Sequence, residues 1–474
     1  MTLPMAALDT ARRGDRVLWG MVAGATAVRL WFAWHFFGFL GGDDVEILQE
    51  AFKVATGLNY VPWNVRNLLL PDLLVAPVVR VGLWLGIHDT GHLAFVSTLP
   101  FVALASVNVV LVYRLASIWV GEITTARAAA VIYAFHWLPL AYGSTVYPRT
   151  ATTTCVLLAA LVLSGPARDT ARGIGAGILL ALAFAGRYSE GMYVLPLVVL
   201  CLTTGRGRAA ARTRTLALLG GSAVAAAAAV GLSDVLAWGR PFASLSELWR
   251  MMVGGTGAEG LSTRPPWFYL LRLLFWMPAT LIPALTFAWR KRRVRWAWAF
   301  LAVPVVLLSL VGHKELRYLQ GAIPFLALLG GAGLVELARR WGRGPAAVLL
   351  VLTIAFEING ANGLARKSMA AVVAARHMAA DPSVRVVALS QSWAYGGRLY
   401  LGNRVEVRDL SLPPSVSTLR AGIAGADRVG LYLSDLLSDP ALAVTLTEHR
   451  FKEFERVEWG ESKTVVVFAR QVQR

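Results

Sequence analysis

A short acidic stretch, GGDDVEILQEAF, follows the first apolar segment of the chain and contains the side chains best suited to proton transfer. The adjacent carboxylates of Asp43 and Asp44 lie where a membrane-embedded site would meet water, and a carboxylate placed there can accept a proton from a hydroxyl group. A structural interpretation is also open. Apolar residues recur at helical spacing after the two aspartates, and acidic residues favour the first turn of a helix, so the stretch also fits a solvated loop leading into an amphipathic helix.

Basic residues that could bind a phosphate gather in two other short stretches. GHKELRY contains His313, Lys314 and Arg317. Such cations can stabilise an anion, although basic side chains at the ends of membrane spans often only extend toward the interface. AGRYSEGMY contains Arg187 and Glu190, which could form no more than a local ion pair.

The composition identifies the kind of protein that holds these residues. Of 474 residues, 56% are hydrophobic and only 16% are charged, which is too apolar for a soluble domain of this length. The formal net charge of +18 comes from short basic clusters between apolar runs, as in cytoplasmic loops, so no nucleic-acid partner is expected. Cys155 and Cys201 lie inside apolar segments, which leaves neither a disulfide framework nor a metal cluster.

About eleven apolar windows have the length of a membrane span. They cover residues 17–37, 93–113, 127–146, 149–164, 173–186, 191–204, 215–237, 268–289, 296–311, 319–337 and 345–362. The first is too long for the core of a signal peptide, so we predict that it is retained. Arg29 lies within it, where a charge costs roughly 3 kcal/mol unless it faces the protein interior. We therefore expect a structural partner for Arg29.

The apolar segment 68–86 decides the orientation of the spans, because it contains Pro71, Asp72, Pro77 and Arg80. If it lies on the outer surface and the N-terminus is cytoplasmic, the basic clusters fall inside, whereas counting it as a span pushes several of them outside. We therefore predict an interfacial segment. The loops 38–92 and 238–267, the GHKELRY turn and the tail then all lie outside the cytoplasm.

The chain divides into two predicted domains. Residues 1–362 form a polytopic α-helical membrane domain that includes both outer loops. Residues 363–474 lose the long apolar runs, and the segments 384–390, 428–434 and 464–470 alternate in the manner of strands between short helices. We expect this tail to be a small extracytoplasmic α/β domain.

These motifs resemble those of glycosyltransferase family 22, mannosyltransferases of the GT-C superfamily that build lipid-linked oligosaccharides and GPI anchors. That family carries His-Pro-Asp-Glu after its first span, then a Gln and a Glu, a Gly, and a Trp and an Arg before a Pro. The corresponding residues here are GGDDVEILQEAF, Gly57, Trp63, Arg66 and Pro71. Gly41-Gly42 replaces the His-Pro of the family, and Asp44 replaces its Glu.

Two further motifs extend the resemblance from about residue 30 to about residue 335. HKELRY matches the His-Lys-Glu-x-Arg-aromatic turn of the family. SDVLAWGRPF, followed by Leu248, Trp249, Gly254 and PPWFYLL, resembles a family loop that contains an Asp, aromatic residues, a Gly and a Pro-Trp. The fold that the resemblance implies is therefore the GT-C fold.

The resemblance also implies an inverting transfer of a sugar, most commonly mannose, from a polyprenyl phosphate to a glycolipid, glycan or glycoprotein. Asp43 and Asp44 would be catalytic, with Asp43 as the general base. The donor phosphate would be bound by Lys314, Arg317, His313 and Arg187. The other residues implied to bind substrate are Glu46, Gln49, Glu50, Trp63, Arg66 and Trp267. A phosphate leaves as an anion, so no cofactor is expected, although an Asp pair could hold Mg²⁺ or Mn²⁺.

The predicted topology also favours a lipid-linked donor, because nucleotide sugars are not supplied outside the cytoplasm and no Gly-rich nucleotide-binding fold is apparent. Other interpretations remain open. The sugar could be arabinose or glucose, or the protein could be a flippase or transporter, which should have inverted repeats and charges near mid-membrane. A structural or sensory protein would not need acidic and cationic groups that face one another. The transferase interpretation predicts that Asp43 faces the GHKELRY turn.

Overall fold

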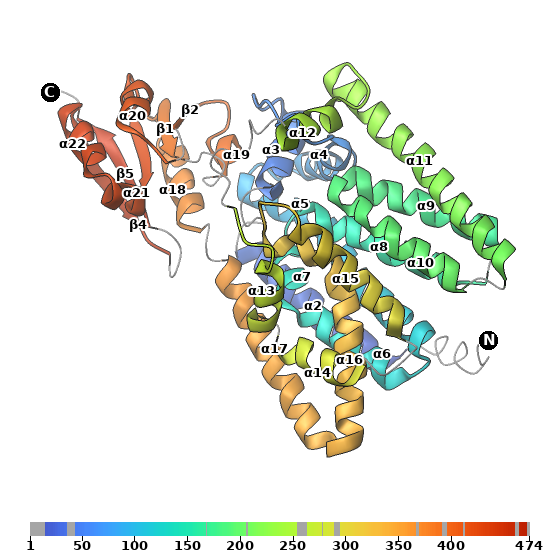
Figure 1. The fold of residues 1–474 in the computed structure, drawn as a ribbon. Coiled ribbons are helices and arrows are strands. Elements are labelled where there is room, and N and C mark those ends of the chain that lie inside the picture. Colours follow the sequence, from blue (N-terminus) through green and yellow to red (C-terminus); the bar gives the residue numbers. More distant parts are fainter. Residues whose placement is uncertain are drawn as a thin grey trace.

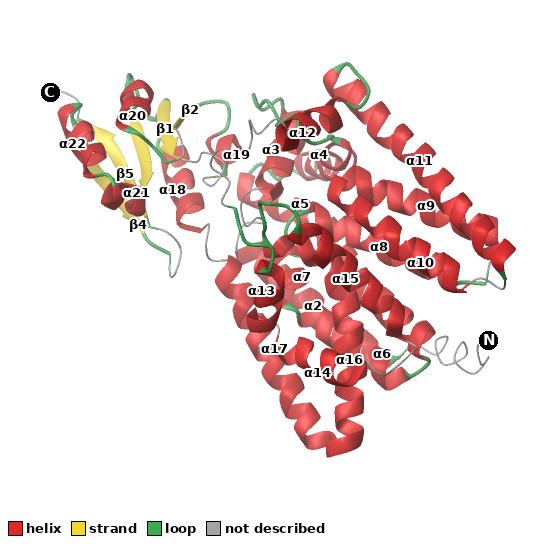
Figure 2. Cartoon of the chain, viewed as in Figure 1, coloured by secondary structure: helices red, strands yellow, loops and turns green. Residues whose placement is uncertain are grey.

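The computed structural model describes residues 15–35, 43–166, 168–204, 207–253, 263–276, 278–288, 294–365, 369–390, 396–410, 413–459 and 464–471. A bundle of helices is joined to a smaller domain that contains all five strands of these residues (Figures 1 and 2). Several positions named in the sequence analysis fall outside the described ranges, namely residues 38–42, Gly254 and the basic residues 290–293.

The bundle follows the chain through sixteen α-helices of the described residues. They are α2 (Arg16–His35), α3 (Asp43–Thr56), α4 (Ala76–Trp84), α5 (Thr90–Val120), α6 (Ile123–Phe135), α7 (Trp137–Tyr142), α8 (Pro148–Ser164), α9 (Asp169–Gly186), α10 (Val194–Thr204), α11 (Arg208–Trp238), α12 (Ala243–Val253), α13 (Phe268–Trp276), α14 (Pro278–Phe287), α15 (Arg295–Ser309), α16 (Ile323–Trp341) and α17 (Arg343–Ala365). Short helical turns of other types precede α4, α10 and α16, at Pro71–Val75, Tyr188–Tyr193 and Leu316–Ala322.

The predicted apolar windows coincide with these helices. The window 127–146 is divided into α6 and α7 because the backbone of His136 is extended between them. In the described part of the chain, six helices are long and apolar enough to cross a membrane: Arg16–His35, Thr90–Val120, Asp169–Gly186, Arg208–Trp238, Leu316–Trp341 and Arg343–Gly363. The protein is therefore an integral membrane protein. The count of about eleven spans, the interfacial placement of 68–86 and the sidedness of the loops stay predictions.

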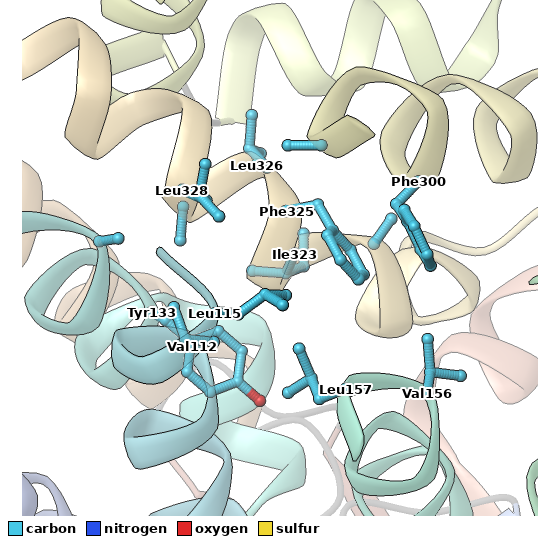
Figure 3. Close-up of a cluster of buried hydrophobic side chains, with 14 of the residues drawn as sticks. Val112, Leu115, Tyr133, Val156, Leu157, Phe300, Ile323, Phe325, Leu326 and Leu328 are labelled. Atoms are coloured by element: carbon cyan, nitrogen blue, oxygen red, sulfur yellow. The ribbon is translucent and has the colours of Figure 1, made fainter. Parts of the chain in front are cut away.

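Helix α16 forms the centre of the bundle, since 83% of its spanning window is buried. Its glycines let neighbouring backbones approach closely. A Cβ added to Gly331 would lie 2.6 Å from the backbone nitrogen of Ala129 on α6, and one added to Gly333 would lie 2.0 Å from the carbonyl oxygen of Pro283 on α14. Figure 3 shows the apolar core beside it, where Phe325 of α16 stacks on Phe300 of α15.

The C-terminal domain is a five-stranded mixed sheet with the order β2-β1-β3-β5-β4. The strands are β1 (Val386–Ser390), β2 (Glu406–Leu410), β3 (Arg428–Tyr432), β4 (Phe451–Val457) and β5 (Val465–Arg470). β1 is parallel to β2 and β3, whereas β5 is antiparallel to β3 and β4. The predicted strand segments correspond to β1, β3 and β5. The alternating pattern did not reveal β2 and β4, because several of their side chains are charged and exposed.

Helices cover both faces of this sheet. Apolar side chains of α20 (Val416–Ile423) and α22 (Pro440–Glu448) pack on one face, with α21 (Leu433–Ser438) between them in sequence. The other face packs on α18 (Met369–Ala380), and α19 (Gly397–Leu401) follows β1. Figure 1 shows α18 on the side of the sheet that faces the bundle.

The C-terminal domain docks on α3, the helix that begins with the two aspartates. Leu48 and Phe52 of α3 share one hydrophobic core with Val387 of β1 and Leu399 of α19. Two polar contacts add to this core: the Gln49 amide donates to the Gly396 carbonyl at 3.1 Å, and the Asn59 backbone nitrogen donates to the Asn403 side chain at 2.7 Å. As a result, α3 is held between the bundle and the sheet domain.

Candidate active site

Asp43 is the centre of a cluster of charged side chains that come from distant parts of the sequence. Its carboxylate is only 3% exposed. One oxygen pairs with the guanidinium of Arg66, which follows α3, and the other lies 2.7 Å from Nη1 of Arg187, which follows α9. Burial alone would raise the pKa of Asp43, but Arg187, Arg66, Arg317 and Arg149 outweigh it and hold that pKa far below the usual range. The carboxylate is therefore ionised at any physiological pH.

Asp44 is completely buried beside Asp43. Its Oδ1 accepts a hydrogen bond from the Val45 backbone nitrogen at 3.0 Å, and its charge interacts with the hydroxyl of Tyr142 on α7. The interpretation of the acidic stretch as a solvated helix start is therefore wrong, because neither aspartate faces water. The amphipathic helix itself is confirmed as α3.

The GHKELRY turn reaches this cluster through Arg317. Its guanidinium pairs with Glu315, interacts electrostatically with Asp43 and lies 5.7 Å from the ring centroid of Tyr147. The expectation that Asp43 faces this turn is thus confirmed for Arg317. A second cation of the turn, His313, lies 3.5 Å from Glu315 through its Nε2 atom.

Lys314 points toward backbone carbonyl groups. It is only 4% exposed, and its ammonium donates to the carbonyl oxygens of Val311 and, at 2.9 Å, of Arg264. The Arg264 backbone nitrogen in turn donates to the Gly312 carbonyl at 3.0 Å. Lys314 thereby ties the turn to the segment before α13, and its contact with a donor phosphate stays a prediction.

Arg149, at the start of α8, belongs to the same cluster but was not identified from the sequence. It is 1% exposed. Its guanidinium pairs with Glu190 and donates to the Tyr318 carbonyl at 3.0 Å and to Ser189 Oγ at 2.9 Å. The local pair suggested for Arg187 and Glu190 is therefore wrong, because each of them has a partner elsewhere. An arginine between two apolar windows was the available signal, since a buried charge there requires a partner.

Three of the other residues implied to bind substrate lie beside Asp43. The Glu46 carboxylate accepts hydrogen bonds from the hydroxyl of Tyr60 and from the backbone nitrogen of Trp63, the latter at 3.4 Å. The Arg66 guanidinium lies 5.3 Å from the centroid of the Trp63 ring. Glu46, Trp63 and Arg66 therefore form one wall next to the buried carboxylate.

The remaining three lie in different surroundings. Gln49 contacts the C-terminal domain, as described above, and Trp267 is exposed just before α13. Glu50 is buried, with its carboxylate 3.8 Å from the Lys53 ammonium. Burial raises the pKa of Glu50 to about 7, Lys53 opposes this shift, and Asp72 adds to it. Substrate contacts of Gln49, Glu50 and Trp267 stay predictions.

A hydrogen-bonded network behind the cluster fixes the backbone that carries two of its arginines. Asp234 on α11 accepts from the nitrogen and the hydroxyl of Ser244 on α12, at 2.9 Å and 2.6 Å. The Ser244 hydroxyl also bonds to the hydroxyl of Tyr188, and Asn67 donates to the Ala185 carbonyl at 2.7 Å. Because Tyr188 and Asn67 directly follow Arg187 and Arg66 in the chain, this network limits where both guanidinium groups can lie.

Two other expectations concern single residues and metals. Arg29 is fully buried on α2 and donates to the Ala134 carbonyl at 3.0 Å, which confirms a structural partner. Within the described ranges, no three His, Cys, Asp or Glu side chains converge on a point where they could hold a metal ion. The expectation that the reaction needs no metal stays a prediction.

Comparison with known proteins follows from this geometry. The sequence model of the Alg9-like mannosyltransferase family matches residues 60–380. Among solved structures, ArnT from Cupriavidus metallidurans bound to undecaprenyl phosphate has a TM-score of 0.62 and 16% identity over 96% of this chain and 98% of that one. A comparison with curated proteins yields no significant match.

Two larger proteins have a similar arrangement. The oligosaccharyltransferase AglB from Archaeoglobus fulgidus, in complex with an inhibitory peptide and a dolichol-phosphate, has a TM-score of 0.51 and 13% identity over 92% of this chain and 72% of that one. The arabinofuranosyltransferase AftD from Mycobacteria has a TM-score of 0.55 and 14% identity over 95% of this chain and 40% of that one. At these identities the similarity establishes the fold alone.

Proposed function

Since the chain belongs to the Alg9-like mannosyltransferase family and is a glycosyltransferase with the GT-C fold, we propose that it transfers a sugar from a polyprenyl phosphate with inversion. On the precedent of the family name the sugar is mannose, and the acceptor is a glycolipid, glycan or glycoprotein. The reaction takes place on the extracytoplasmic side, where such donors are available and where the sheet domain also lies.

The observation that carries this proposal is the contact of the Asp43 carboxylate with Arg66 and Arg187. A buried carboxylate beside several guanidinium groups offers both functions that the transfer needs. The carboxylate removes a proton from the acceptor hydroxyl, and the cations bind the phosphate of the donor.

The transfer balances with these groups alone. The acceptor oxygen forms a bond to the anomeric carbon from the face opposite the phosphate, and its proton passes to Asp43. The bond between the anomeric carbon and the phosphate oxygen breaks, and its electron pair remains on the phosphate. Arg66, Arg187 and Arg317 stabilise the charge that develops there, so neither a general acid nor a metal ion is part of the proposal.

Donor binding also prepares the base. Without a ligand, Arg66 and Arg187 depress the basicity of Asp43 because they are paired with it. A phosphate that binds the same guanidinium groups neutralises part of their charge, and the pKa of Asp43 then rises toward the range in which a carboxylate can accept a proton during the reaction. Asp44 supports Asp43 from its buried position on the same helix turn.

The donor class has support from two proteins of the same fold. The ArnT structure contains undecaprenyl phosphate, and the AglB complex contains a dolichol-phosphate. For this chain, we expect the phosphate of such a lipid to bind at the arginines, with Glu46 and Trp63 beside the sugar. The acceptor and the length of the polyprenol are not part of the proposal.

The test uses the purified full-length protein in lipid nanodiscs. Polyprenyl-phosphate mannose, arabinose and glucose are supplied in parallel with membrane glycolipid extract, and release of polyprenyl phosphate is measured. The proposal expects release from one of these donors by the wild type and none by Asp43→Asn. Release from the arabinose or glucose donor alone would change the sugar but keep the reaction. If no donor is consumed while the lipid is moved across the bilayer, the protein is a flippase.

A further inference from the structure

Tyr147 lies in the turn between α7 and α8, directly before the first residue of α8. It is completely buried. Its backbone nitrogen donates to Thr145 Oγ1 at 3.2 Å, and Pro148 after it starts the helix. The ring packs on Tyr142 with a centroid separation of 4.5 Å. The backbone and the ring of Tyr147 are therefore firmly placed.

The hydroxyl of Tyr147 has no such placement by hydrogen bonds. It is buried from solvent and bonds to none of the described residues. Most buried polar groups in native proteins have a partner, and leaving one without a partner costs about 1–3 kcal/mol. A group of this kind in a candidate site indicates a partner that is supplied by the ligand.

The surroundings of this hydroxyl identify the charge of that ligand. Tyr147 interacts electrostatically with Arg317, Arg149 and Arg187 and with one carboxylate, Asp43. The cations outnumber the anion, so an anionic ligand atom is favoured there. Burial raises the pKa of the Tyr147 hydroxyl above its usual value, so the group keeps its proton and can act as a donor.

A second tyrosine shows that a buried hydroxyl without a partner is not sufficient. Tyr193, at the end of the turn before α10, also bonds to none of the described residues through its hydroxyl. A Cβ added to Gly321 would lie 2.7 Å from that oxygen, so protein atoms pack tightly against it. Its charged neighbours, Glu190 and Arg149, are already paired with each other. Tyr193 therefore has neither the space nor the charge surplus for an anion.

We propose that the Tyr147 hydroxyl donates a hydrogen bond to a phosphate oxygen of the polyprenyl phosphate donor. This inference rests on the proposed function and adds a residue to its donor site. When the bond to the anomeric carbon breaks, its electron pair stays on the phosphate, and the hydrogen bond strengthens as that charge grows. Tyr147 keeps its proton throughout.

The experiment compares wild type, Tyr147→Phe and the matched control Tyr193→Phe as full-length proteins in nanodiscs. Binding of undecaprenyl phosphate is titrated, and turnover is measured with the sugar donor that the wild type uses. Loss of a hydrogen bond to a charged group should weaken binding by Tyr147→Phe about 10-fold and lower turnover by about 10-fold or more. Tyr193→Phe should match the wild type in both measurements.

Thermal unfolding separates binding from packing. Because the hydroxyl makes no bond in the unliganded protein, Tyr147→Phe should unfold at the same or a slightly higher temperature, while undecaprenyl phosphate should stabilise it less than the wild type. If Tyr147→Phe does not fold, 3-fluorotyrosine at position 147 keeps the hydroxyl and should preserve binding; loss of binding there would assign the effect to packing and overturn the proposal.

The remaining outcomes distinguish the two proposals. Equal binding and turnover by wild type and Tyr147→Phe would remove Tyr147 from the donor site while the proposed function stands. A wild type that neither binds undecaprenyl phosphate nor transfers any sugar would remove the proposed function, and this inference with it.

Discussion

The Asp43 carboxylate and the Arg187 guanidinium are in contact, with 2.7 Å between Oδ2 and Nη1. One residue begins the helix after the first span, and the other follows α9 in a different part of the bundle. This pair joins the group that can accept a proton to a group that can bind phosphate. It also explains why the unliganded protein tolerates a buried carboxylate, because an ion pair compensates for the lost hydration.

The first prediction concerns the two aspartates. Asp43→Asn keeps the shape of the side chain but removes the base, so sugar transfer should fall by at least about 10². Asp44→Asn should cost less, since Asp44 lies behind Asp43 and accepts a hydrogen bond from its own helix. Turnover of the purified variants measures both. An active Asp43→Asn enzyme would falsify the assignment of the base, and a reversed ranking would transfer the role to Asp44.

The second prediction concerns pH. Arg66 and Arg187 keep the pKa of Asp43 low in the free enzyme, and a bound phosphate competes for both. The acidic limb of kcat/KM, which reports the free enzyme, should therefore lie at lower pH than the acidic limb of kcat, which reports the complex. Profiles between about pH 3 and pH 8 check this, with a thermal-stability scan to exclude unfolding. Coincident limbs would contradict competition between the phosphate and the carboxylate.

The third prediction separates two cations of the GHKELRY turn. Arg317→Ala should lower turnover by about 10² to 10³, the scale of losing one preorganised charge-stabilising group. Lys314→Met keeps the length of the side chain but loses its bonds to the Val311 and Arg264 carbonyls. It should lower the unfolding temperature more than it lowers turnover at a permissive temperature. Equal losses of turnover in two stable variants would place Lys314 in the donor site as well.

The fourth prediction concerns the buried carboxyl group of Glu50. Its pKa of about 7 lies above the ordinary value of 4.5, so the folded state holds a proton that the unfolded state has released. Stability should therefore decrease as pH rises from about 4.5 to about 7 and then level off, by at most about 3 kcal/mol. Glu50→Gln should remove this decrease and be more stable than the wild type at pH 8 but not at pH 4. Thermal unfolding at both values measures the effect, and parallel curves for the two proteins would contradict it.

The fifth prediction concerns the network behind the arginines. Ser244→Ala removes the hydroxyl that bonds to Asp234 and Tyr188, so the backbone before Tyr188, which carries Arg187, should be less well placed. We expect the KM for the lipid donor to rise by about 10-fold, with a smaller change in kcat. Ser246→Ala on the same helix is the control, because its hydroxyl bonds only to the Ala243 carbonyl. Rescue by Ser244→Thr should follow if the hydroxyl bond is responsible, and a change in stability alone would assign the network a structural role.

Much of the architecture was accessible from the sequence. Apolar windows located the helices of the bundle because hydrophobicity over about twenty residues is a local property that does not depend on the partner of a helix. The alternating segments of the tail located β1, β3 and β5 for the same reason. The acidic stretch and the GHKELRY turn identified Asp43 and Arg317, since buried or membrane-proximal charges are rare enough to stand out in an apolar chain.

The partners of those charges were decided by tertiary structure alone. Local spacing suggested a pair of Arg187 and Glu190, but packing brings Arg187 to Asp43 and places Arg149 against Glu190. Likewise, Lys314 and Arg317 have the same charge and lie three residues apart, yet one binds backbone carbonyls and the other reaches the site. Ion pairing depends on distance and desolvation in space, and neither quantity is encoded in the spacing of residues along the chain.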